Sequence, residues 1–156
     1  MATLKYEKIF NLFLGSVKDY EFASLDEISR NECLVEWLHD SVANTYVNHI
    51  FSSIELDDVL QTVTYELERP STNENIDADY VCSILAKQIV YQWLSPKLNT
   101  TTSLDQAFLT GSDSKFFAQA NHIQSMLDVS ERADLEVRRL IRDRGYISNS
   151  YLDGGN

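Results

Sequence analysis

The C-terminal third of the chain carries the feature that most constrains its fold, an uninterrupted helical pattern from Lys115 to Arg144. These thirty residues contain no glycine or proline, and Gly145 follows them, at a position where a left-handed helix cap is common. At 1.5 Å per residue such a helix is roughly 45 Å long, well beyond the average helix of about 11–12 residues. We therefore expect a rod that projects beyond the body of a small domain.

The apolar positions of this predicted helix change face about halfway along it. Ser130 and Asp134 interrupt the first apolar seam, and a second seam resumes on a shifted face. The two seams comprise Phe116, Ala120, Ile123 and Leu127, and then Ala133, Val137, Leu140 and Ile141. We therefore expect the two halves of the helix to pack against different surfaces.

The helical spacing of apolar residues predicts two helices in the N-terminal third of the chain. The first spans Leu4 to Leu14, and Gly15 follows it as a terminator. The second spans about Leu25 to His49. Ser24 and Glu27 have the spacing of a capping box, which favours a helix start at this point.

A third helix is predicted from about Asp77 to Leu94, and its expected inner face comprises Val81, Ile84, Leu85, Ile89, Val90 and Trp93. It should end before Pro96, because proline pushes the residue before it away from helical geometry. A polar loop from Asn99 to Ser103 and a short helix from Leu104 to Leu109 are expected next, and Gly111 should break that helix. The long C-terminal helix then follows.

The segment from Phe51 to Asn75 has no helical period. It carries an extended-looking run from Thr62 to Tyr65 before Pro70. We interpret it as an acidic connection that contains a short strand or an extended arm.

These elements together predict a mainly α fold, a small helical bundle with a long C-terminal helix. The chain of 156 residues is long enough to bury one real core, and its hydrophobic content of 44% is ordinary for a globular protein. We expect a single domain over residues 1–156, with the acidic mid-chain loop or short strand and an extended C-terminal tail, residues 145–156, as its appended features.

Charge is distributed unevenly along the chain. The formal net charge is −11, which makes nonspecific binding to nucleic acid phosphates an unfavourable function. Between Glu55 and Asp79 there are eight acids and the single base Arg69, whereas five of the seven arginines lie between Arg132 and Arg144. The two segments are either complementary interaction surfaces or ordinary solvated faces that complement helix dipoles.

No constellation of an enzyme or of a metal site is present in the sequence. The three histidines, His39, His49 and His122, have no second ligand at a useful spacing, and no GxSxG or glycine-rich phosphate loop occurs. Cys33 and Cys82 lie in helix-like apolar patterns, which is typical of buried free thiols in a reducing cytoplasm. No apolar run reaches the length of about 18 residues that a membrane span needs. We therefore expect a soluble protein without a catalytic residue, metal or cofactor.

The stretches ILAKQIVYQWLSPKLNT (residues 84–100) and FLTGSDSKFFAQANHIQSMLDVSERADLEVRRLIRDRGY (residues 108–146) resemble a family of small virion proteins of tailed bacteriophages, encoded among the head–tail connector genes. In that family a helix ending in WLxP is followed by a short loop, a helix start of the type Y/F-x-Q-A-N-H and a long charged helix. The residues that match are Trp93, Leu94 and Pro96, and then Phe117, Gln119, Ala120, Asn121 and His122. The N-terminal part matches only in its general pattern of apolar helix positions.

This resemblance implies a structural subunit of the virion neck, assembled in the host bacterial cytoplasm. Such subunits form homo-oligomeric rings, commonly of twelve, that join the portal protein to neighbouring neck or tail proteins. DNA passes through the lumen without specific binding, and no membrane is involved. On this basis the predicted partner-binding residues are Arg138, Arg139, Arg142, Arg144, Tyr146, Tyr151 and Leu152.

The sequence leaves a second function open. Its acidity is also typical of a cytoplasmic, phage-encoded inhibitor that binds a host protein by mimicking nucleic acid. The arginine cluster and the hydrophobic tail argue against it, since a mimic needs an extended surface of one sign.

Overall fold

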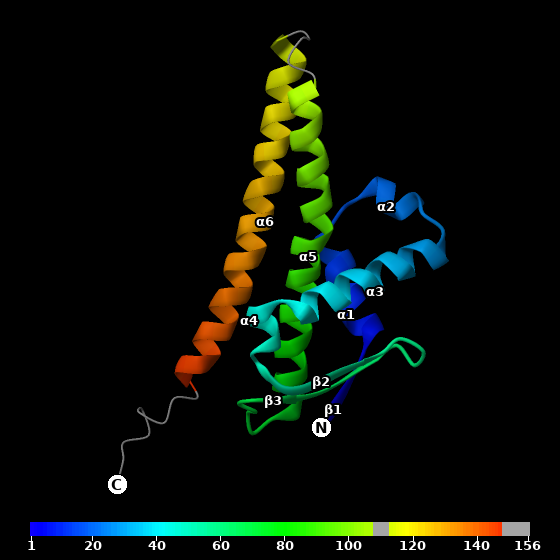
Figure 1. Ribbon diagram of the computed structural model, residues 1–156. Coiled ribbons are helices and arrows are strands. Elements are labelled where there is room, and N and C mark those ends of the chain that lie inside the picture. The colour runs from blue at the N-terminus through cyan, green and yellow to red at the C-terminus, as the bar shows by residue number, and fades with distance from the viewer. Residues whose placement is uncertain (108–112, 148–156) are drawn as a thin grey trace.

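The computed structural model describes the backbone of residues 1–107 and 113–147, and the side chains of residues 1–19, 22–98 and 124–145. These residues form six helices and a three-stranded sheet (Figure 1). The expected mainly α, small helical fold is confirmed. The β structure is more extensive than the short strand that the sequence predicts.

Two long helices dominate the molecule. Helix α5 spans Glu74–Ala107 and helix α6 spans Asp113–Ile147. They lie side by side and antiparallel, and their upper halves project beyond the other elements, which gather around the lower half of α5 (Figure 1). The predicted long C-terminal helix and its projection from a small body are therefore confirmed.

Helix α5 is longer than predicted because it continues through Pro96. The expected helix end at residue 94 and the expected loop from Asn99 to Ser103 are therefore wrong. Proline removes one backbone hydrogen bond and crowds the preceding turn. That local preference is outweighed here, because α6 packs along α5 and supports the continued helix (Figure 1). The predicted break at Gly111 lies outside the described residues.

The glycines expected to end helices do not do so. Helix α1 spans Tyr6–Ser16 and so includes Gly15, and α6 continues two residues past Gly145. Neither glycine has a positive φ, so neither forms the left-handed cap that the sequence suggested. The tail that was expected from residue 145 therefore begins later, since α6 ends at Ile147.

An antiparallel sheet with the strand order β1-β3-β2 lies below the helices (Figure 1). Its strands are β1 (Ala2–Lys5), β2 (Phe51–Asp57) and β3 (Thr62–Leu67). The expected connection over residues 51–75 is thus mainly a β-hairpin. Leu4, which was assigned to the first helix, is paired with Val63 in the sheet, because a partner strand distant in sequence overrides a short helical pattern.

The second helix predicted in the N-terminal third is shorter than expected and is followed by a separate short helix. Helix α2 spans Tyr20–Ser24, α3 spans Glu27–Ala43 and α4 spans Thr45–Asn48. The single helix expected from residue 25 to 49 is divided at Asn44, whose side chain accepts a hydrogen bond from the Tyr46 amide, 3.0 Å away, and caps α4. Asp26, rather than Ser24, caps α3 by accepting from the Ser29 amide at 3.0 Å.

The core surrounds the lower half of α5, which α1, α3, β1 and α6 all contact. The predicted inner face of α5 is buried except for the half-buried Trp93, and the buried residues of the sheet and of the other five helices join it in one continuous cluster. Phe13 lies at its centre, in edge-to-face contact with Phe22, Trp37 and Trp93. Both tryptophans are half-buried and pack against the core. Among the described helices, none is long and apolar enough to span a bilayer.

Candidate protein-binding surface

The last turns of α6 present one face to α5 and the opposite face to solvent. Ser130, Ala133 and Val137 are buried on the inner side. Successive residues of an α-helix are rotated by about 100°, so the side opposite these three residues is centred on Leu135. Leu135 is 64% exposed. A leucine held this far out on a regular helix is a candidate contact for another protein.

Arg132, Arg138 and Arg139 lie one turn from this leucine on the outer side, and Arg142 lies two turns from it. The acids Asp128, Glu131 and Glu136 line the same shallow hollow. We define the basic face of α6 as Arg132, Leu135, Arg138, Arg139 and Arg142. The last two arginine side chains are 74% and 62% exposed, and both lie near the single carboxylate of Asp143, at 3.5 and 3.6 Å. Arg132 is exposed and forms no ion pair within the described residues. Arg139 and Arg142 share one carboxylate, so positive charge is available to a partner at the C-terminal end of the face.

Arg138 lies at the inner margin of the basic face. Its Nε donates to Asp134 at 2.8 Å, one turn earlier in the helix. Its guanidinium is stacked over the ring of Tyr46 from α4, 4.1 Å from the ring centroid. This aromatic contact fixes the orientation of one arginine while its side chain stays 46% exposed.

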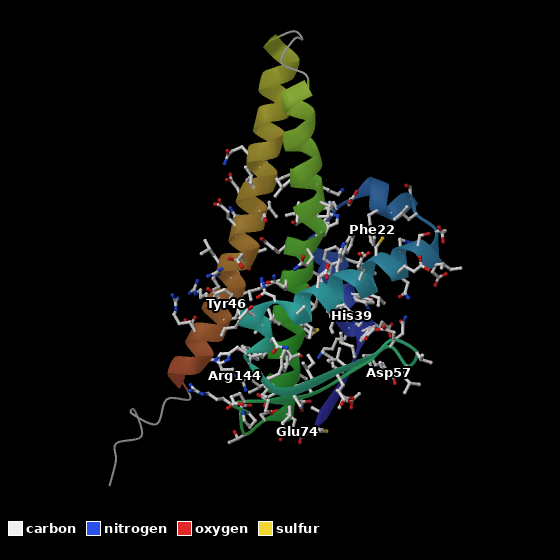
Figure 2. All side chains as sticks on the ribbon, viewed as in Figure 1. Phe22, His39, Tyr46, Asp57, Glu74 and Arg144 are labelled. Atoms are coloured by element: carbon white, nitrogen blue, oxygen red, sulfur yellow. The ribbon has the colours of Figure 1, made fainter. Side chains whose placement is uncertain are left out.

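Arg144 has a different position from the other predicted partner-binding arginines. Its side chain is only 16% exposed, and it forms an ion pair with Asp77 at the start of α5. It also donates to the carbonyl oxygen of Arg69 at 3.1 Å and lies over the ring of Tyr80 at 4.3 Å. Figure 2 shows its side chain directed into the molecule, between the end of α6 and the sheet. Arg144 therefore holds the fold together at this point, a role that the sequence did not indicate.

Asp77 is the acceptor at the centre of this clamp. The Ser71 amide donates to it at 2.9 Å, in addition to Arg144. Burial of the carboxylate opposes its ionisation, but the donors from Arg144 and Ser71 together keep the pKa of Asp77 below its usual value. The N-terminal turn of α5, the loop before it and the end of α6 are thus joined through one carboxylate.

The remaining predicted partner-binding residues belong to the C-terminal tail. The backbone of Tyr146 is in the last turn of α6, while its side chain lies outside the described residues. Tyr151 and Leu152 lie outside the described residues altogether. Their predicted binding role stays a prediction.

The β2–β3 turn is a second exposed feature, which the sequence did not single out. We define the acidic turn as residues Asp57 to Leu60. Val59 and Leu60 are 92% and 71% exposed. One oxygen of Asp57 accepts from the amides of both, at 3.0 and 2.9 Å, and Gln61 completes the turn with a positive φ of 52°. Two aliphatic side chains are thus held out into solvent by an ordered turn.

Asp58 fastens the acidic turn to the helices. It accepts from the buried Tyr6 hydroxyl at 2.8 Å and lies 3.0 Å from Nε2 of His39. The hydrogen bond from Tyr6, and then that from His39, lower the pKa of Asp58. His39 therefore has a structural partner. Within the described part of the chain, no group of three His, Cys, Asp or Glu residues is placed to hold a metal ion.

The outer face of the sheet continues the negative charge of the turn. Side chains alternate along the strands, so Glu55 and Asp57 share this face with Glu66 of the neighbouring strand, opposite the buried side of β3. Lys5 of β1 is the base on the same face. Four of the eight acids between Glu55 and Asp79 thus lie on the hairpin, whereas Asp77 and Asp79 lie in α5, paired with Arg144 and Lys8.

An apolar groove lies where α1, α2 and α3 meet. It has a volume of about 560 Å³, and Phe13, Val17 and Leu34 are among its lining residues. Asp19 borders it and is bound to the core by the Trp93 indole N–H at 2.9 Å and the Lys97 ammonium at 2.6 Å. No charge pattern distinguishes its occupant, so we do not assign a partner to it.

Comparison with protein-family models, with curated proteins and with solved structures finds no match for this chain. What the protein binds is therefore inferred from its own surfaces.

Proposed function

We propose that this protein is a structural virion subunit of a tailed bacteriophage, a head–tail connector protein. In this role it forms a homo-oligomeric ring, commonly of twelve copies, that joins the portal protein to the next neck or tail component. The proposal assigns it no catalytic activity and no cofactor. Its class comes from the resemblance in residues 84–100 and 108–146.

The observation that carries the proposal is the uncovered basic face of α6. Leu135 is 64% exposed among arginines and acids, on a helix whose inner side is packed against α5. Arginine and exposed apolar side chains in such an arrangement are typical of protein interfaces, where the apolar contact supplies energy and the charges set the partner. A subunit of a larger assembly needs such a face.

The two-helix projection supports the same role. The upper halves of α5 and α6 extend away from the body, so they place a surface at a distance from the core that stabilises it (Figure 1). A rod of this kind can contact a component that the body of the subunit does not reach. An isolated inhibitor that covers one site on a host protein has no need for it.

The negative charge of the chain suits a conduit for DNA. A wall with a net charge of −11 per subunit repels phosphate groups, so a duplex moves past it without sticking. We assign this role to the part of the acidic segment that follows the hairpin, where Glu68 and Glu74 are exposed.

The proposal is tested by expressing the full chain with the portal protein encoded in the same genome. Co-purification of the two proteins, and rings in negative-stain images of the complex, are the expected results. A dispersed monomer that ignores the portal and captures a host enzyme would overturn the proposal and favour the inhibitor.

A further inference from the structure

We propose that the acidic turn of one copy docks on the basic face of α6 of a second copy. This inference rests on the proposed function, since it names the contact between neighbouring subunits of the ring. In this contact Val59 and Leu60 pack against Leu135, and the acids of the adjoining outer sheet face, Glu55, Asp57 and Glu66, lie near Arg139 and Arg142.

The acidic turn has the properties of a docking element. Val59 is 92% exposed, yet its backbone is fixed by Asp57 and by the positive φ of Gln61. Asp58 ties the turn to the buried hydroxyl of Tyr6. Because the turn is already ordered in the free subunit, little conformational freedom is lost when it binds.

The basic face of α6 has the complementary properties. Leu135 provides an apolar contact, and its helix is held in place by the buried seam on its inner side. Arg139 and Arg142 share Asp143 as their nearby carboxylate, so additional carboxylates can be accommodated. The acids beside Val59 and Leu60 are such groups.

The charges argue for a contact between unlike surfaces. In a chain with a net charge of −11, most pairs of surfaces from two copies repel each other. The segment from Arg132 to Arg144 is the exception, since its four outward-facing arginines outnumber its three acids, Asp134, Glu136 and Asp143. It is the surface of a second copy on which an acidic turn is favoured.

The two surfaces lie on opposite sides of the subunit. Figure 2 shows Asp57 at the far end of the β-hairpin, and Tyr46 and Arg144 on the other side of α5, beside α6. One molecule therefore cannot join its own turn to its own basic face. Joining unlike surfaces of successive copies is a heterologous contact, which propagates and closes into a ring when the rotation allows.

Cysteine cross-linking tests the contact directly. In a Cys33→Ser background, Val59→Cys combined with Leu135→Cys should give a ladder of disulfide-linked multimers under mild oxidation, because each copy has one thiol on each surface. The matched control combines Ile28→Cys, an aliphatic position on α3 that is 72% exposed, with Leu135→Cys. A ladder that forms no faster than in the control would overturn the proposal.

Charge exchange tests it independently, by sedimentation velocity of the full chain. Arg139→Glu with Arg142→Glu, and separately Glu55→Arg with Glu66→Arg, should each weaken self-association about tenfold or more. The chain that carries all four changes should recover it. Glu32→Arg with Glu36→Arg, two exposed acids of α3, is the control for net charge and should not weaken assembly.

The outcomes separate this inference from the proposed function. Rings on the portal without the cross-linked ladder and without recovery in the fourfold variant would overturn the turn-to-helix contact alone. If the disulfide-linked ladder forms and the fourfold variant recovers self-association, but the protein does not bind the portal, the contact between copies would be established and the connector role would be overturned. A wild-type chain that stays monomeric at high concentration overturns the contact.

Discussion

Arginines on the two sides of the last turns of α6 have opposite roles. Arg144 is 16% exposed and bound to Asp77, whereas Arg139 and Arg142 are 74% and 62% exposed beside Asp143. All three residues are arginines of the same helix, and they differ only in the side of the helix from which their side chains extend. An arginine cluster read from a sequence therefore combines residues that hold the fold with residues that can bind a partner.

The two sides of the helix differ energetically because solvent screens the exposed ion pairs and does not screen the buried one. A buried ion pair leaves an uncompensated charge in the interior when one partner is removed, which is strongly destabilising. An exposed pair is screened and contributes about 0–1 kcal/mol. Arg144 also joins the end of α6 to the start of α5, 67 residues away in the chain.

The largest effect is expected from Arg144→Ala. It leaves Asp77 buried without its main partner and should lower the free energy of unfolding by about 2–4 kcal/mol. Urea unfolding followed by circular dichroism measures this. Arg139→Ala, on the same helix, is the control and should change stability by less than about 0.5 kcal/mol. Equal losses in the two variants would show that the inner and outer sides do not differ.

The pH dependence of stability gives a second test of the buried Asp77–Arg144 ion pair. The pKa of Asp77 is lowered in the folded state, so its contribution is present above the unfolded value of about 3.9 and is lost as the pH falls through the folded value. Wild type should therefore exceed Asp77→Asn in stability most at neutral pH, and the difference should shrink below about pH 4. Chemical unfolding of both proteins between pH 7 and 3 measures it. A difference that does not vary with pH would contradict the depressed pKa.

The sequence predicted the parts of the fold that depend on local periodicity. The length of α6 and the inner face of α5, with Val81, Ile84, Leu85 and Ile89 buried, followed from helical spacing. The continuation of α5 through Pro96 did not, because packing against α6 outweighs the local preference of proline. The pairing of β1 with β3 was also missed, since it joins segments some sixty residues apart.

The candidate site was only partly accessible to the same reasoning. The arginine cluster was visible in the sequence, but the separation of Arg144 from Arg139 depends on the direction of one helical turn relative to α5. The sequence of the acidic turn contains one pattern that indicates an exposed position. Val59 and Leu60 are aliphatic residues beside two aspartates in a segment without helical period, a pattern typical of an exposed hairpin tip.

A smaller effect is expected from Tyr6→Phe, which extends the comparison to the acidic turn. There too one residue, Asp58, holds the fold, while Val59 is free to bind. Loss of the hydroxyl removes one hydrogen bond to Asp58 and should lower stability by about 1 kcal/mol. Thermal unfolding measures it, and Val59→Ser should leave stability nearly unchanged. The reverse order would mean that Val59, rather than Asp58, anchors the turn.

The smallest effect on stability is expected from neutralising the outer side, with Arg139→Gln and Arg142→Gln together. Both side chains point into solvent, so the free energy of unfolding should change by less than about 0.5 kcal/mol. Self-association should nevertheless weaken, and weaken less than with the two glutamates, because attraction is removed without adding repulsion. Sedimentation velocity over a range of salt concentrations measures this, and the salt dependence of assembly should decrease in the glutamine variant. Assembly that is unchanged in strength and in salt response would mean that these two arginines, although exposed, take no part in the contact between copies.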